Sequence, residues 1–169
     1  MKKLGISLLV LALVLSFVSA NAATFGVRTN LNALTTVAAG TAGNLGTSVV
    51  IGLDKIDLLV AYGNSTTGAS GANTSTAMGL GAIYWFANKG EVKVGVGIGY
   101  NSTNSGASGA NSTSAIQLSI EGQAEVAKGL ALGVQLPLYQ TYTTGASGAS
   151  TASSLLVNAA NVYAQVTLF

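Results

Sequence analysis

The sequence predicts an all-β protein, a closed antiparallel up-and-down transmembrane β-barrel of eight strands. Three observations support this fold class. Charged residues are scarce, apolar and polar residues alternate along much of the chain, and long glycine-rich connections alternate with short charged turns. Together they indicate strands that hold one face in hydrocarbon and the other in a narrow interior.

Residues 1–22 have the features of a signal peptide. Lys2 and Lys3 precede an apolar run over residues 4–18, and Ala20-Asn21-Ala22 is a small-x-small cleavage site. We therefore expect export from the cytoplasm and a mature chain, residues 23–169, that forms one barrel domain. An uncleaved membrane anchor is the alternative, because the apolar run is close to the minimum length of a spanning helix. The cleavage triplet argues against it.

The charge content of the mature chain is unusually low. Without Lys2 and Lys3, five basic and five acidic residues remain, so the formal net charge is zero. A soluble domain usually devotes about 25–35% of its surface to charged side chains. The many apolar and β-branched residues exclude a disordered tract. Much of the surface should therefore meet a solvent other than water, and nothing in the charge favours nucleic-acid binding.

Two kinds of connection divide the mature chain. Three nearly identical glycine-rich loops occupy 68–72, 106–110 and 145–149, and a fourth of similar kind covers 38–46. Between them lie three tight-turn sequences, at residues 54–55, 88–91 and 128–129. The predicted strands are therefore 24–35, 47–54, 56–66, 75–87, 91–103, 113–127, 130–144 and 151–169.

These segments alternate with a period of two, which is typical of strands. In the segment 113–127, Ile116, Leu118 and Ile120 alternate with Gln117, Ser119 and Glu121. The polar face carries too few charges for an exterior in water, whereas small and amide side chains suit a narrow interior. The apolar face then meets lipid, and the sheet must close because an open edge in hydrocarbon leaves backbone groups unsatisfied.

Aromatic residues near the strand ends fit the interfacial girdles of membrane barrels. They are Tyr62, Tyr84, Phe86, Tyr100 and Tyr142. Ordinary strand propensity explains any one of them equally well.

Four charged residues fall on the polar face within strands: Arg28, Lys93, Glu121 and Glu125. The other six mature charges, Asp57 among them, lie in or beside the turns. We expect Arg28 or Lys93 to pair with Glu121. Two interpretations of the four residues stay open, a structural salt-bridge network in the lumen or a gate in an ion path.

A row of glycines should leave one wall of the lumen bare: Gly79, Gly81, Gly95, Gly97 and Gly99. These glycines either make room for Trp85, Tyr139 and Arg28 or line a narrow water-filled passage. The interior of an eight-stranded barrel is just wide enough for side chains to fill, which favours the first interpretation.

The sequence offers no catalytic, cofactor-binding or metal-binding set. It has neither histidine nor cysteine and few carboxylates, so we expect no enzyme activity, no cofactor and no metal. The uncharged loops are either a surface for adhesion or partner binding, with a partner that the sequence does not name, or solvated linkers that close hairpins.

A signal peptide, eight amphipathic strands, short turns opposite longer loops and the C-terminal Phe169 resemble the OmpA/OmpX-type class of small outer-membrane barrels. The resemblance covers the whole mature chain and rests on pattern. It implies the bacterial outer membrane as location, contact with outer-membrane lipid, and a role for Phe169 in the signal read by the barrel-assembly machinery.

The last segment departs from this class in one respect. Phe169 shares parity with Gln165 and Tyr163, whereas the apolar row contains Val166 and Leu168. Either Phe169 lies just past the lipid-facing row, or a bulge between Asn158 and Asn161 shifts the register.

The favoured function is a non-enzymatic structural or surface role in the outer membrane. A narrow pore or a carrier for small solutes is the alternative. A secreted soluble barrel with an apolar ligand cavity requires the opposite assignment of faces and conflicts with the low charge.

Overall fold

The computed structural model describes residues 24–31, 46–67, 73–105, 111–144, 150–154 and 160–168. The predicted signal peptide, the glycine-rich loop segments 68–72, 106–110 and 145–149, and Phe169 lie outside these residues. The strands are β1 (Thr24–Asn30), β2 (Thr47–Leu53), β3 (Ile56–Thr67), β4 (Asn73–Lys89), β5 (Val92–Ser105), β6 (Asn111–Ala127), β7 (Leu130–Thr144), β8 (Ser150–Ser154) and β9 (Asn161–Thr167). In this part of the chain, no helix has the length and apolar character needed to cross a membrane.

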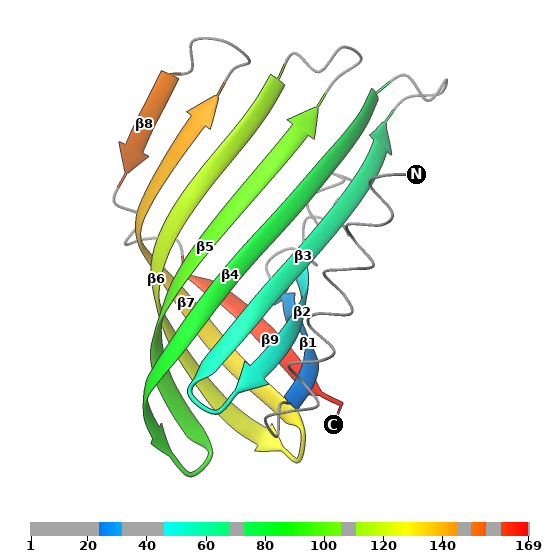
Figure 1. Cartoon of the computed structure of the whole chain (residues 1–169). Coiled ribbons are helices and arrows are strands. Elements are labelled where there is room, and N and C mark those ends of the chain that lie inside the picture. The colour runs from blue at the N-terminus through cyan, green and yellow to red at the C-terminus, as the bar shows by residue number, and fades with distance from the viewer. Residues whose placement is uncertain are drawn as a thin grey trace.

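The strands form a closed antiparallel up-and-down barrel, as predicted. Each strand from β1 to β7 pairs with the next, and β9 pairs with both β7 and β1, which closes the sheet. β8 pairs with the far end of β7, so β8 and β9 together occupy the eighth position of the barrel. Figure 1 shows β4 and β5 as long tilted strands at the front of the barrel, with the short β9 behind them.

The three predicted tight turns are confirmed. Two-residue turns at 54–55, 90–91 and 128–129 join β2 to β3, β4 to β5 and β6 to β7. Asp54, Gly90 and Gly129 have φ angles of 48°, 62° and 76°. Glycine adopts this left-handed region without steric cost, and aspartate does so more readily than most residues. These residue types therefore set where the turns fall.

The eighth predicted strand is divided. Its described pairing with β7 stops at Gln140 opposite Ser154 and resumes at Gln135 opposite Asn161. The interruption brackets Pro137, the single proline of the chain, which lacks the backbone N–H that a ladder bond requires. Of the predicted bulge region, Asn158 to Asn161, residues 158 and 159 lie outside the described residues.

The apolar rows face outward. Ile98 and Val166 belong to the apolar rows of the sheet, yet their side chains are 54% and 44% exposed. The outward row includes Leu58, Val60, Leu80, Val96, Ile98, Ile116, Leu118, Leu132, Val134, Val162 and Val166. Of the predicted girdle, Tyr62, Tyr84, Phe86 and Tyr100 also point outward, and the side chain of Tyr142 is outside the described part. The barrel is therefore apolar outside, and its interior combines polar and charged side chains with apolar ones such as Val50 and Ile83.

The wall of the barrel has unequal height. β4 and β6 each have 17 residues, whereas β1, β2 and β9 have seven. On β5 the outward apolar row ends at Tyr100, and Ser102 and Asn104 continue it. The upper parts of the long strands thus extend a polar sheet beyond the apolar band, and they rise above the short strands in Figure 1.

Candidate functional site

An ion pair crosses the lumen between β1 and β6. The Nη2 of Arg28 donates to Oε2 of Glu121 over 3.0 Å, and the two side chains are 8% and 1% exposed. Because β7 and β9 separate these strands in the barrel, the pair joins distant parts of the wall. Sequence periodicity placed both residues on the inner face, and Arg28 is the predicted cation that reaches Glu121.

Neighbouring side chains complete the environment of Glu121. Its Oε1 accepts hydrogen bonds from Ser119 Oγ at 2.8 Å and Gln135 Nε2 at 2.7 Å. Asn161 Nδ2 donates to Gln135 Oε1 at 3.3 Å, which extends the network to β9. Burial of a charge is tolerated when it is paired and hydrogen-bonded, and this carboxylate meets both conditions.

Tyr163 of β9 fills the space beside the ion pair. Its side chain is 1% exposed, and its ring centroid lies 3.4 Å from Cζ of Arg28. The ring packs against Gly133, where any side chain would collide with it. Sequence reasoning did not assign Tyr163 this role, although its parity with Gln165 placed it on the inner face.

The prediction that Tyr139 fills the lumen is wrong. Tyr139 is 40% exposed and pairs with Leu118 on the outer face. A β-bulge between Leu118 and Ser119 inserts Leu138, so both Leu138 and Tyr139 point outward. A bulge shifts the alternation by one residue, and the sequence pattern does not reveal where it occurs.

Trp85 and Asp57 fill the lumen nearer the turns. The Nζ of Lys93 lies 5.9 Å from the Trp85 ring centroid, within cation–π range. Asp57 was expected beside a turn, yet it is buried, interacts electrostatically with Lys93 and Arg28, and faces the side chains of Trp85 and Gln165. The arrangement balances two cations with two carboxylates. We call Arg28, Asp57, Trp85, Lys93, Glu121 and Tyr163 the lumen cluster.

Glu125 does not join the lumen cluster. Its side chain is exposed, and Oε1 accepts a 2.9 Å hydrogen bond from the backbone N–H of Gly129 in the β6–β7 turn. A second bulge, between Glu125 and Ala127, ends the regular pairing there. Glu125 pairs with the buried Ala131 ahead of that bulge, so it keeps the predicted polar-face register. It lies beside the turn, however, where its side chain is exposed rather than enclosed in the lumen.

The glycine wall serves two purposes in two places. A Cβ on Gly95 would lie 2.9 Å from Cε3 of Trp85, and one on Gly97 would lie 2.7 Å from Ser119 Oγ. These glycines therefore admit the lumen cluster. A Cβ on Gly99 would meet only a backbone oxygen at 3.9 Å, and one on Gly81 would make ordinary contacts. Those two positions border open space.

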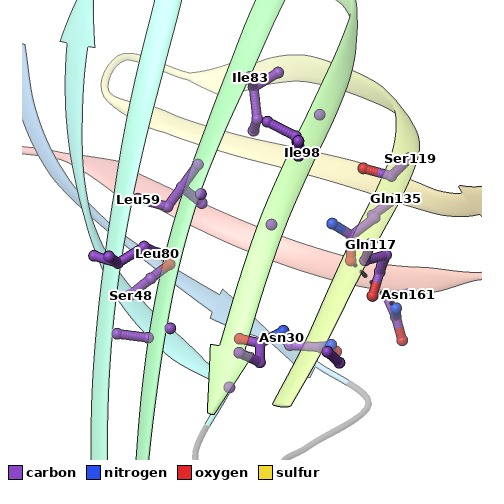
Figure 2. Close-up of a pocket in the computed structure, with 18 of the residues that line it drawn as sticks. Asn30, Ser48, Leu59, Leu80, Ile83, Ile98, Gln117, Ser119, Gln135 and Asn161 are labelled. Atoms are coloured by element: carbon purple, nitrogen blue, oxygen red, sulfur yellow. Dashed lines mark hydrogen bonds between the residues drawn. The ribbon is translucent and has the colours of Figure 1, made fainter. Parts of the chain in front are cut away.

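That space is a cavity of about 480 Å³ at the end of the barrel where the long loops begin. Arg28, Glu121 and Tyr163 lie at its floor, and Asn30 and Thr103 lie near its mouth. We call it the loop-side cavity. Figure 2 shows Leu59 on the opposite side from Gln117, Gln135 and Asn161, so the cavity has one apolar and one amide-rich wall.

The chemistry available in the lumen is ion pairing and hydrogen bonding. Among the described residues, no group of three or more His, Cys, Asp or Glu side chains could hold a metal ion. The Glu121 carboxylate is engaged by three donors. The lumen cluster can therefore link strands across the lumen. The lining of the loop-side cavity suits an uncharged molecule.

The sequence matches no protein-family model and none of the curated proteins. Among solved structures, the chain is similar to a major outer membrane protein from Thermus thermophilus, at 14% identity. The similarity covers 88% of this chain and 100% of that chain, with a TM-score of 0.33.

Proposed function

We propose that this chain is a non-enzymatic outer-membrane β-barrel of the OmpA/OmpX-type class, with a structural and surface role and no open channel. The observation that carries this proposal is the lumen cluster. The Arg28–Glu121 bridge, Tyr163 and Trp85 fill the lumen, and each of these side chains is less than a tenth exposed.

The exterior supports a position in a membrane. The outward rows of valine, leucine and isoleucine form an apolar surface around the closed sheet. Contiguous exposed apolar surface of this kind is rare on soluble monomers and typical of lipid-facing barrel walls. Outer-membrane lipid is thus the proposed partner of this surface, and the barrel-assembly machinery would act during insertion.

The height of the wall supports the surface role. β4 to β7 continue past the apolar band as a sheet whose outward residues include Ser102, Asn104 and Thr141. Outside the hydrocarbon, strands with these hydroxyl and amide side chains contact water. The barrel would anchor this polar sheet and its uncharged loops at the cell exterior.

Single-cysteine labelling tests the position in the membrane. The chain has no native cysteine, so Ile98→Cys, Leu118→Cys and Gln117→Cys each give one labelled site. A spin label is attached at each site, and the protein is placed in lipid vesicles. We expect oxygen to increase the relaxation rate of the labels at Ile98→Cys and Leu118→Cys more than a water-soluble nickel chelate does. Asn104→Cys, beyond the apolar band, is the control that the chelate should reach. Chelate access at Ile98 and Leu118 would contradict the proposal.

A narrow pore is the second candidate, because the loop-side cavity extends down to the Arg28–Glu121 pair. Only the lumen cluster would then separate the two ends of the barrel. Planar-bilayer recording distinguishes the candidates. We expect no steady conductance from the wild type or from Glu125→Gln, and measurable conductance from the double variant Arg28→Ala/Tyr163→Ala. Steady conductance of the wild type would favour the pore.

A further inference from the structure

We propose that the loop-side cavity is a binding site for a small uncharged, hydroxyl-rich molecule of the monosaccharide class. This inference goes beyond the surface role proposed above. It rests on the size of the cavity, on its two unlike walls and on the absence of an unpaired charge along the described part of its lining.

The dimensions of the loop-side cavity suit a small ligand. Its volume of about 480 Å³ falls within the roughly 300–1,000 Å³ typical of ligand pockets, which occur in the mouths of β-barrels among other places. The lumen cluster closes its floor. A molecule that enters from the loop end would therefore be held in the upper lumen rather than pass through.

The amide-rich wall has unused hydrogen-bonding capacity. Gln117 and Gln140 lie opposite each other in the β6–β7 register and both line the cavity. In the described part of the chain, neither side chain has a hydrogen bond. Asn161 uses its amide N–H toward Gln135, and its oxygen makes no described bond. Each amide offers both donors and acceptors, which matches hydroxyl groups that also donate and accept.

The charges at the floor argue for an uncharged ligand. Arg28 and Glu121 neutralise each other, so a charged solute placed above them would lack a counter-ion in the lining that the structure describes. Removal of an ion from water without a partner is costly, whereas a neutral polyol needs only its hydrogen bonds replaced. The cavity should therefore discriminate against charged relatives of its ligand.

The opposite wall is mainly apolar, although Ser48 lies on the same side as Leu59 (Figure 2). Leu59 and Ala61 of β3 lie beside Gly81 and Gly99, which leave room for close approach. A sugar ring presents C–H groups on one face and hydroxyls around its rim. The C–H face would pack on this wall while the hydroxyls reach Gln117, Gln140 and Asn161.

The test uses the protein refolded in detergent micelles and three probes: glucose, glucuronate as its anionic relative and glucosamine as its cationic relative. The side-chain amide signals of isotope-labelled glutamine and asparagine are followed by NMR. We expect glucose to shift the signals of Gln117 and Gln140 in a saturable manner. The two charged probes should bind at least about tenfold more weakly, because their charge has no partner in the cavity.

A pair of matched variants tests the location. Gly99→Leu adds a side chain to the cavity directly opposite Gln117, and Gly122→Leu adds the same side chain to the outer face. Heat-modifiable gel mobility reports that each barrel has folded. We expect Gly99→Leu to weaken glucose binding by about tenfold or more and Gly122→Leu to leave it unchanged. Gln117→Leu, which keeps the size and removes the amide, should weaken it by about tenfold.

Three outcomes would overturn the inference: no saturable shift with glucose in the folded wild type, equal binding of the charged probes, or equal binding by Gly99→Leu. None of these would change the expected conductance of the wild type. Failure of the binding site and failure of the non-conducting barrel are therefore distinguishable.

Discussion

The two halves of the lumen have opposite construction. Toward the turns, Trp85, Tyr163 and the Arg28–Glu121 pair occupy the interior, and Gly95, Gly97 and Gly133 give them room. Toward the loops, Gly81 and Gly99 lie on the same inner row and border a cavity. Gly95, Gly97 and Gly133 are therefore needed to admit neighbouring side chains, whereas Gly81 and Gly99 leave space for something from outside the chain.

The largest expected effect comes from breaking the ion pair in the filled half. Glu121→Leu leaves Arg28 buried without its counter-ion, and loss of one partner of a buried pair costs roughly 3–5 kcal/mol. The free energy of unfolding can be measured with urea in lipid vesicles, using the fluorescence of Trp85, the single tryptophan, as probe. The double variant Arg28→Met/Glu121→Leu should recover much of the loss. A loss below about 1 kcal/mol for Glu121→Leu would mean that the pair is not buried as described.

A matched pair of glycine substitutions compares the two halves directly. Gly133→Ala forces a methyl group into the Tyr163 ring, and overpacking of this kind costs roughly 1–3 kcal/mol. Gly99→Ala points into the loop-side cavity and should change the free energy of unfolding by no more than about 0.5 kcal/mol. The same urea titration measures both. Equal losses would show that the upper half is as tightly filled as the lower half.

The smallest effect is expected at Glu125, which lies outside both halves. Glu125→Gln keeps an oxygen that can accept the Gly129 N–H, so the free energy of unfolding should change by less than about 0.5 kcal/mol. Glu121→Gln is the matched control, because it removes the same charge from beside Arg28 and should be clearly destabilising. If the two variants were equally destabilised, Glu125 would belong to the lumen network after all.

Several features of the site were predictable and others were not. A pairing of Glu121 with Arg28 or Lys93 followed from their position on one face and their opposite charges, and the structure decided for Arg28. The burial of Asp57 in the lumen cluster was not predicted. Asp57 lies only two residues from a turn in the sequence, and that closeness does not reveal whether its side chain is buried. Tyr139 was misplaced because a bulge beside it changes the facing, and the aromatic side chains that fill the lumen are Trp85 and Tyr163.

The sequence by itself determined most of the strands, the turns and the two faces of the wall away from the bulges, because period-two alternation and left-handed turn residues act over a few neighbouring positions. Only the tertiary structure decided which inward side chains meet. Arg28 and Glu121 are 93 residues apart, and their contact depends on closure between β1 and β9 and on the stagger of the strands. Bulges adjust that stagger at single positions, so the division of the lumen into a filled and an open half is a property of the closed barrel rather than of any one strand.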